Sequence, residues 1–298
     1  MVIIKKKLPI AVLCAALGNI IWGFSFLFTK VGLAIAPDPA VMLAHRFLFS
    51  ALFMAMPIVI GKKKLSFKGK KITPILLLLL MQVCYYLFET YGLLYTNATI
   101  AGLVLAVVPV VTIGTGVLFL KEYPTRRQAL FCIMPVVGVI LMTVSGQELG
   151  VVKPLGILFL LLTMLASAFY KTANRRAALE FSPYERTFLV LTVSSLFFTV
   201  VSFSKVNWDP AAFLKPLLRG KYLFSVLSLS LLCSIGANLL VNYASGKMSV
   251  FKVASFGSLS TLCSVLAGVL ILGEPVSIPL LIGAVLILVG IHQVTKQK

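Results

Sequence analysis

The sequence predicts an all-α integral membrane protein of ten transmembrane helices, arranged as two inverted repeats of five helices with both termini in the cytoplasm. Composition is the first support, because 60% of the 298 residues are hydrophobic and only 12% are charged. So little polar surface cannot cover a soluble globule of this size. The other supports are apolar runs of about 20 residues, long enough to cross a bilayer as helices, and a likeness between the two halves of the chain.

The apolar runs follow one another with short connections, so neighbouring helices are expected to run antiparallel. Only residues 205–221 form a longer connection, which we expect to be a loop. The first run follows a lysine cluster as in a signal peptide, but no A-x-A-type cleavage site follows it, so we expect it to be retained. The expected spans are residues 9–34, 38–60, 73–95, 98–120, 128–145, 154–179, 184–204, 221–244, 249–272 and 276–294.

Basic residues are unevenly distributed between the two ends of these spans. With the amino terminus in the cytoplasm, 18 of the 27 Lys and Arg residues lie on the inner side, 5 on the outer side and 4 within spans. Inner loops carry the excess of Lys and Arg, which favours this orientation, although the connection after the seventh span is a local exception. The net charge of +19 is therefore interpreted as an orientation signal, and no nucleic-acid partner is expected.

An internal repeat divides the chain into residues 1–150 and 151–298. A shift of 152 residues lays LKE at 120–122 over LGE at 272–274, and Gly138 over Gly290. Five spans is an odd number, so the second unit must enter the membrane from the opposite side to the first. Inverted repeats recur in secondary transporters, whose substrate site lies between the halves near the middle of the membrane.

Several segments resemble a known family. WGFSFLFTK in the first span, HRFLFSALF in the second, YGLLYTNATIAGLVLAVVPVVT across the third and fourth, and GEP after the ninth are similar to the EamA family of the drug/metabolite transporter superfamily. The family's GE reads Lys121-Glu122 in the first half, and Thr261 stands where the first half keeps Pro109. The resemblance covers essentially the whole chain and implies metabolite transport, with amino-acid export as one known activity and drugs or sugars as cargo of other relatives.

Polar side chains form stripes at helical spacing on some spans, whereas residues 128–145 and 276–294 are nearly featureless. We expect the striped spans to line a central polar cavity and the featureless ones to lie at the periphery or in a homodimer contact. Taken singly, Ser, Thr and Asn can also simply bridge neighbouring helices. The candidate cavity residues are Asn19, Trp22, Arg46, Gln82, Tyr86, Glu89, Tyr170, Lys171, Asn238 and Asn242.

Glu89 is the first suspect for function, because it is the only carboxylate well inside an apolar run. Three roles stay open: an ion pair with Arg46 at a similar depth, binding of a cationic substrate group, and proton carriage. Lys30 could share this level or reach the interface. Lys171 could meet an anionic group or likewise extend to the interface.

The remaining polar and small residues have simpler expected roles. Trp22 is either a wall of the cavity or filler beside the next glycine. Glu122 and Glu274, at span ends, are expected to make capping or loop contacts, and Gly138 and Gly290 to permit close helix contact.

No enzyme signature is present. The two histidines, His45 and His292, have no further ligand at metal-binding spacing, and the five cysteines fall within apolar runs as packing residues, so no metal or cofactor is expected. The prediction is a secondary transporter or facilitator of small polar metabolites in the cytoplasmic membrane, with amino acids or related compounds as substrates and export favoured. The alternatives are an uptake carrier for another small metabolite and a membrane-embedded lipid-modifying enzyme.

Overall fold

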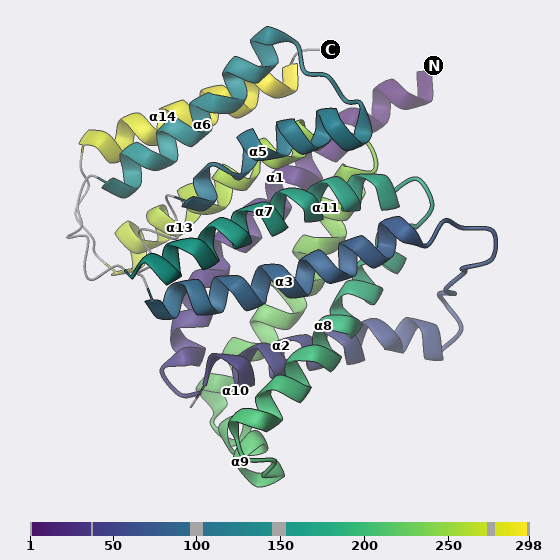
Figure 1. The fold of residues 1–298 in the computed structure, drawn as a ribbon, viewed down its shortest axis with the longest axis vertical. Helices are drawn as coiled ribbons and strands as arrows, with labels where there is room; N and C mark the ends of the chain where they lie inside the picture. Colours follow the sequence, from purple (N-terminus) through teal and green to yellow (C-terminus); the bar gives the residue numbers. More distant parts are fainter. Residues whose placement is uncertain (1, 37, 96–103, 145–152, 273–277, 297–298) are drawn as a thin grey trace.

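The computed structural model describes residues 2–36, 38–95, 104–144, 153–272 and 278–296, and every regular element in these ranges is helical (Figure 1). The first half contains α1 (Val2–Leu33), α2 (Pro39–Val59), α3 (Thr73–Tyr95), α5 (Val108–Thr115), the π-helix η1 (Gly116–Leu120) and α6 (Arg126–Val144). The second half contains α7 (Pro154–Ala177), α8 (Pro183–Lys205), α9 (Pro210–Leu214), the 3-10 helix η2 (Lys215–Leu218), α10 (Gly220–Ser228), the π-helix η3 (Leu229–Ala237), α11 (Asn238–Ser245), α12 (Val250–Ser255), α13 (Gly257–Leu272) and α14 (Ile278–Lys296).

The described helices fit a multi-pass membrane protein. Five stretches are long and apolar enough to cross a membrane: Pro39–Val59, Thr73–Gly92, Pro154–Ala177, Pro183–Lys205 and Gly220–Ser245. Shorter apolar helical stretches cover Pro9–Ser25, Val104–Leu120, Val250–Cys263 and Leu281–Lys296. Each stretch falls on an expected span, so the all-helical membrane class is confirmed. The count of ten spans and the cytoplasmic position of the termini stay predictions.

Proline and capping residues set the starts of several helices. Pro39 begins α2 behind Asp38, whose carboxylate accepts a backbone N–H at 2.7 Å. Pro183 begins α8 behind Ser182, which forms a capping box with Glu185. Proline suits the first helical turn because its fixed φ is helical and its missing N–H is not needed there, and the capping oxygen satisfies a free N–H.

The two halves of the chain pack against each other with the same helix pairing in both directions. α2 packs on α8 and α6 packs on α14, so helices in equivalent positions of the two halves pair with each other. α7 packs on α3, whereas α1 packs along η3 and α11 (Figure 1). The first helix of each half therefore lies against the third span of the other half, as a two-fold relation between the halves requires.

Two glycines, one on α6 and one on α14, show the same two-fold relation in their contacts. A Cβ added to Gly138 would lie 2.9 Å from Ile287, and one added to Gly290 would lie 2.5 Å from Pro135. The shift of 152 residues that superposes Gly138 on Gly290 also superposes Pro135 on Ile287. The prediction that both glycines permit close helix contact is confirmed. The pair α6 and α14 lies at one edge of the molecule in Figure 1 and carries exposed apolar side chains.

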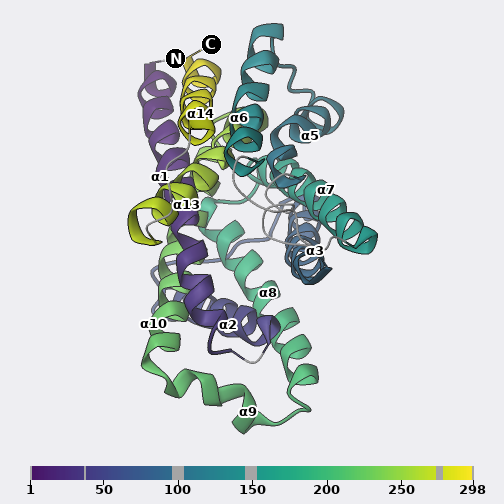
Figure 2. The same cartoon turned by 90° about the vertical axis from the view of Figure 1, so that its left-hand side faces the viewer.

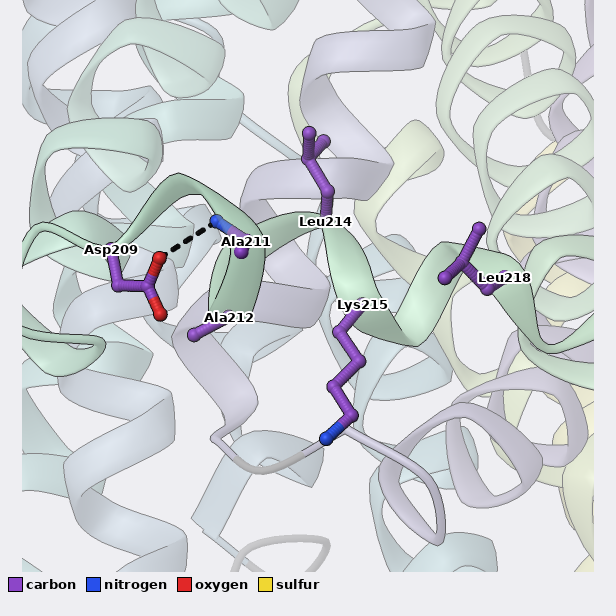
Figure 3. Close-up of a pocket in the computed structure, with 6 residues that line it drawn as sticks. All are labelled: Asp209, Ala211, Ala212, Leu214, Lys215 and Leu218. Atoms are coloured by element: carbon purple, nitrogen blue, oxygen red, sulfur yellow. Dashed lines mark hydrogen bonds between the residues drawn. The ribbon is translucent and has the colours of Figure 1, made fainter.

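The connection after α8 is not the plain loop that the sequence suggested, because it folds into α9 and η2. The Asp209 carboxylate accepts the Ala211 backbone N–H at 2.9 Å and starts α9 ahead of Pro210 (Figure 3). Phe213 is buried, with its ring 4.8 Å from that of Phe203, and it holds the segment against α8. A start signal inside a polar connection and one buried aromatic residue explain the difference. The segment lies at the opposite end of the molecule from the chain termini (Figure 2).

Candidate functional site

Arg46 joins the two halves of the chain in the interior. It lies on α2 with 7% of its surface exposed, and its Nε–H donates to the Ser234 hydroxyl of η3 at 2.7 Å. A buried charged group in a membrane protein is expensive and is placed where it meets polar partners. The structure therefore puts a cation at the boundary between the halves, with a neutral side chain as its partner.

Aromatic rings surround the Arg46 guanidinium. Its central carbon lies 5.6 Å from the ring centre of Phe47 and 5.9 Å from that of Tyr86 on α3. These two rings meet edge to face at 5.1 Å, and Phe198 of α8 stacks on Phe47 at 5.6 Å. Cation–π contacts stabilise a guanidinium without neutralising it. Arg46 thus keeps its charge available to a further group.

The described partner of Glu89 is a tyrosine. The Tyr85 hydroxyl donates to the Glu89 carboxylate at 2.8 Å, and the Tyr85 ring lies 5.1 Å from that of Tyr86. Among the described residues no cationic nitrogen lies within 4.0 Å of the Glu89 oxygens. The Arg46–Glu89 ion pair, one of three roles left open by the sequence, is not formed in this structure. Lys30 lies on α1, but its side chain is outside the described part of the chain.

Two further buried amides on α3 and α11 have polar atoms without a partner in the described part of the chain. Gln82 is 7% exposed and makes no hydrogen bond within the described part of the chain. Asn238 is also 7% exposed; its amide nitrogen donates to the Ser234 carbonyl at 2.7 Å, while its side-chain oxygen has no described donor. Buried polar groups are normally hydrogen-bonded, so such groups indicate a place for water or ligand.

The residues proposed on α7 lie across from α3. Tyr170 packs against the apolar cluster formed by Ile75 and Leu78, and Lys171 is half-buried and donates to the Ser167 hydroxyl at 3.1 Å. No carboxylate lies within ion-pair distance of Lys171 among the residues that the structure describes. Lys171 is therefore a second intramembrane cation with a neutral partner.

Asn242 lies in a buried hydrogen-bond network, in which the Arg186 Nε has no partner within the described ranges. Its amide nitrogen donates to Thr187 at 2.7 Å and its side-chain oxygen accepts from Asn174 at 2.8 Å. Arg186, only 1% exposed, donates to the side-chain oxygen of Asn174 and to the backbone carbonyls of Asn174 and Asn242. This network ties α7, α8 and α11 together, and the sequence pattern did not predict it. A cavity role for Asn242 stays a prediction.

Asn19 and Trp22, the candidates on α1, make contacts of different reach. The Asn19 amide donates to the Ala15 carbonyl at 2.8 Å within its own helix. The Trp22 indole N–H donates to the Cys233 carbonyl at 2.9 Å, across the boundary between the halves. Cys233 precedes Ser234 in the π-helical η3, a type of turn that is frequent at functional sites. Trp22 thus anchors the segment that supplies the partner of Arg46.

Two carboxylates, Glu122 and Glu185, link segments that are far apart in the sequence. Glu122 accepts from Arg175 at 2.8 Å and from the Val250 backbone N–H at 2.7 Å. Glu185 accepts from Lys70 at 2.7 Å and from the Ser66 backbone N–H at 3.1 Å. The prediction that Glu122 makes capping or loop contacts is confirmed, whereas Glu274 lies outside the described residues. In the predicted orientation both groups lie on the inner side.

A hollow of about 80 Å³ lies between α2, α3 and α8, toward the ends expected to face outward. It is lined by Asp38, Pro39, Ala40, Leu43, Leu87, Thr90, Tyr91, Phe198, Val201 and Lys205. Phe198 also contacts both rings around Arg46, so the wall of the hollow is continuous with the Arg46 surroundings. A volume this small holds a few waters, whereas ligand pockets measure roughly 300–1,000 Å³. The larger hollow of about 500 Å³ in Figure 3 lies on α9 and η2, away from these residues.

Known proteins resemble this chain along its whole length. The profile of the EamA-like transporter family matches residues 9–144 and again residues 154–295. The uncharacterized transporter YcxC of Bacillus subtilis (strain 168) is 31% identical over 292 residues, which are 97% of this chain and 93% of that protein. An uncharacterized transporter of Archaeoglobus fulgidus is 22% identical over 93% of this chain and 95% of its own length. A solved crystal structure with 16% identity reaches a TM-score of 0.76 over 95% of each chain, which shows likeness of fold alone.

Proposed function

Since the chain belongs to the EamA-like transporter family, we propose that it moves small polar metabolites across the cytoplasmic membrane by alternating access. The substrates are amino acids or related compounds, and export is the favoured direction. The chain is a multi-pass membrane transporter of this family, as the matched segments and the apolar helices indicate. The family points to a transporter rather than an enzyme.

One observation carries the proposed transport path. Buried polar groups gather where α2 of the first half meets η3 of the second half, with Arg46 and Ser234 in direct contact and Tyr86 of α3 beside Arg46. Secondary transporters built from inverted repeats bind substrate at such an interface near the middle of the membrane. We therefore place the substrate between repeats 1–150 and 151–298, beside Arg46, Gln82, Glu89 and Asn238.

The contacts at the two ends of the bundle suggest how access alternates. Glu122 and Glu185 each hold together segments that are far apart in the sequence, at the end opposite the hollow. Opening that end would require these contacts to break, and admitting a metabolite from the hollow would require Phe198 and its neighbours to move. The substrate would thus reach one side at a time.

A metabolite-wide export screen tests this function. Cells expressing the wild type should raise the external concentration of at least one amino acid or related metabolite above that of cells without the protein. Glu89→Gln should lower that export at least tenfold, about 1.4 kcal/mol, because it removes the carboxylate from the proposed path. The control is Glu180→Gln, which removes a carboxylate from the turn after α7.

Three outcomes would contradict the proposal at different points. Full export by Glu89→Gln across a range of pH would remove both the cation-binding and the proton-carrying roles of Glu89. Absence of export of every metabolite by folded wild type, combined with uptake of a labelled compound, would assign the opposite direction. Absence of both would count against transport itself.

A further inference from the structure

We propose that Arg46 anchors a carboxylate group, so that the ligands of this chain are carboxylic acids, with or without an amino group. The physiological meaning of such a site rests on the proposed transport function. The donors, rings and charges around Arg46 support the site itself.

Most hydrogen-bond donors of Arg46 have no partner among the described residues. A guanidinium carries five N–H donors, and Nε–H is engaged by Ser234 at 2.7 Å. No acceptor among the described residues takes the Nη donors, although the side chain is only 7% exposed. A buried charged donor set of this kind is costly unless a further acceptor meets it.

The described contacts of the guanidinium leave its two Nη groups for a ligand. Phe47 and Tyr86 lie over it at 5.6 and 5.9 Å, and Ser234 takes its Nε side. The two Nη groups remain, and their parallel N–H bonds match the two oxygens of a carboxylate. Flanking rings favour a flat acid group, because its oxygens can lie in the guanidinium plane.

Unpartnered amides supply an independent sign of a ligand. Gln82 is 7% exposed without a described hydrogen bond and lies one turn before Tyr86 on the same face of α3. The side-chain oxygen of Asn238 also lacks a described donor, and its nitrogen binds the carbonyl of Ser234. An acid with a nearby amino or hydroxyl group would give these amides partners.

The charges of the described interior favour an anion. Glu89 accepts from Tyr85, and no carboxylate lies within 4.0 Å of Arg46 or Lys171 in the described part of the chain. Arg46, Lys171 and the buried Arg186 therefore all have neutral partners, whereas the intramembrane carboxylate is that of Glu89. A bound acid restores the balance, whereas a cationic ligand would increase the excess.

Matched ligands test the anchor by isothermal titration of the purified full-length protein. The probes are L-leucine, L-leucinamide and 4-methylpentanoate, and the equivalent set of L-phenylalanine, L-phenylalaninamide and 3-phenylpropanoate. Each set keeps one carbon frame while the acid or the amine is removed. In the wild type, the acids of at least one set should bind at least about tenfold more tightly than the amide, because only they offer two oxygens to Arg46.

Variants then assign the preference to Arg46. Arg46→Gln should bring the acid-to-amide ratio to about 1, and Arg46→Lys should weaken acid binding about tenfold, because an ammonium cannot make the paired contact. Arg126→Gln, which removes an exposed arginine at the start of α6, should leave the ratio unchanged. Thermal unfolding of each variant checks that it is folded.

Several results would overturn the anchor. These are amides that bind as tightly as acids, an unchanged ratio in folded Arg46→Gln, or binding of inorganic phosphate with no binding of any acid. The proposed function fails separately: acids that bind through Arg46 but are not transported would leave the site and remove the transport proposal. Transport by a protein that binds acids and amides equally well would remove the anchor and leave the transport proposal.

Discussion

At the scale of single residues, Trp22 ties α1 to the helix that supplies the partner of Arg46. Trp22→Phe keeps most of the ring volume but leaves the Cys233 carbonyl without its indole donor. Leaving a buried acceptor unsatisfied costs about 1–3 kcal/mol, so we expect thermal unfolding at a lower temperature. Trp208→Phe, which alters a tryptophan that is 66% exposed, should change stability by less than about 0.5 kcal/mol.

This prediction also separates the two roles that the sequence left open for Trp22. An anchoring residue affects stability and leaves the KM of transport unchanged. An unchanged unfolding temperature together with an altered KM would instead make Trp22 a wall of the substrate path.

The same scale shows what the sequence could and could not predict about the site. Arg46 and Glu89 stand out in sequence because charges within apolar runs are rare. Their partners do not, because Ser234 and Tyr85 are chosen by helix rotation and by contact between the halves. Depth along the helices made an Arg46–Glu89 pair one of three open roles, and the described geometry gives each of the two residues a neutral partner.

At the scale of helices, the contact between α6 and α14 depends on glycine. Gly290→Ala would place a methyl group 2.5 Å from the ring of Pro135, too close for unshifted helices. Such overpacking typically costs about 1–3 kcal/mol, so the unfolding temperature should fall. Gly114→Ala is the matched control, since a methyl group there meets nothing within 4 Å and alanine favours a helix. Equal unfolding temperatures for the two variants would contradict the close packing.

Helix positions were predictable from apolar length, and the ends of α2, α7 and α8 lie within a few residues of the expected spans. Two features were not predictable in this way. The π-helical turns of η3, which packs against α1 and α2, have no composition of their own. α9 follows from an Asp-Pro start inside a connection that hydropathy alone describes as a loop.

At the scale of the whole molecule, helices of one half of the repeat pack against the equivalent helices of the other half. The 152-residue shift relates the contact of Gly138 with Ile287 to that of Gly290 with Pro135, and helices in equivalent positions pair across the halves. The sequence predicted two units from a few matching residues and inversion from an odd number of spans. It also shows that the charges are unequal, because Glu89 has no carboxylate counterpart in the second half, where Val241 is nearest in the repeat.

The central claim is that substrate crosses between these halves beside Arg46. The most direct measurement is the initial rate of entry of a labelled substrate, identified by the export screen, into liposomes that contain the purified protein. Wild type and Gly114→Ala should give a saturable rate, and folded Arg46→Gln should lose at least nine-tenths of it. Absence of saturable entry with folded wild type, or an unchanged rate with folded Arg46→Gln, would contradict the claim.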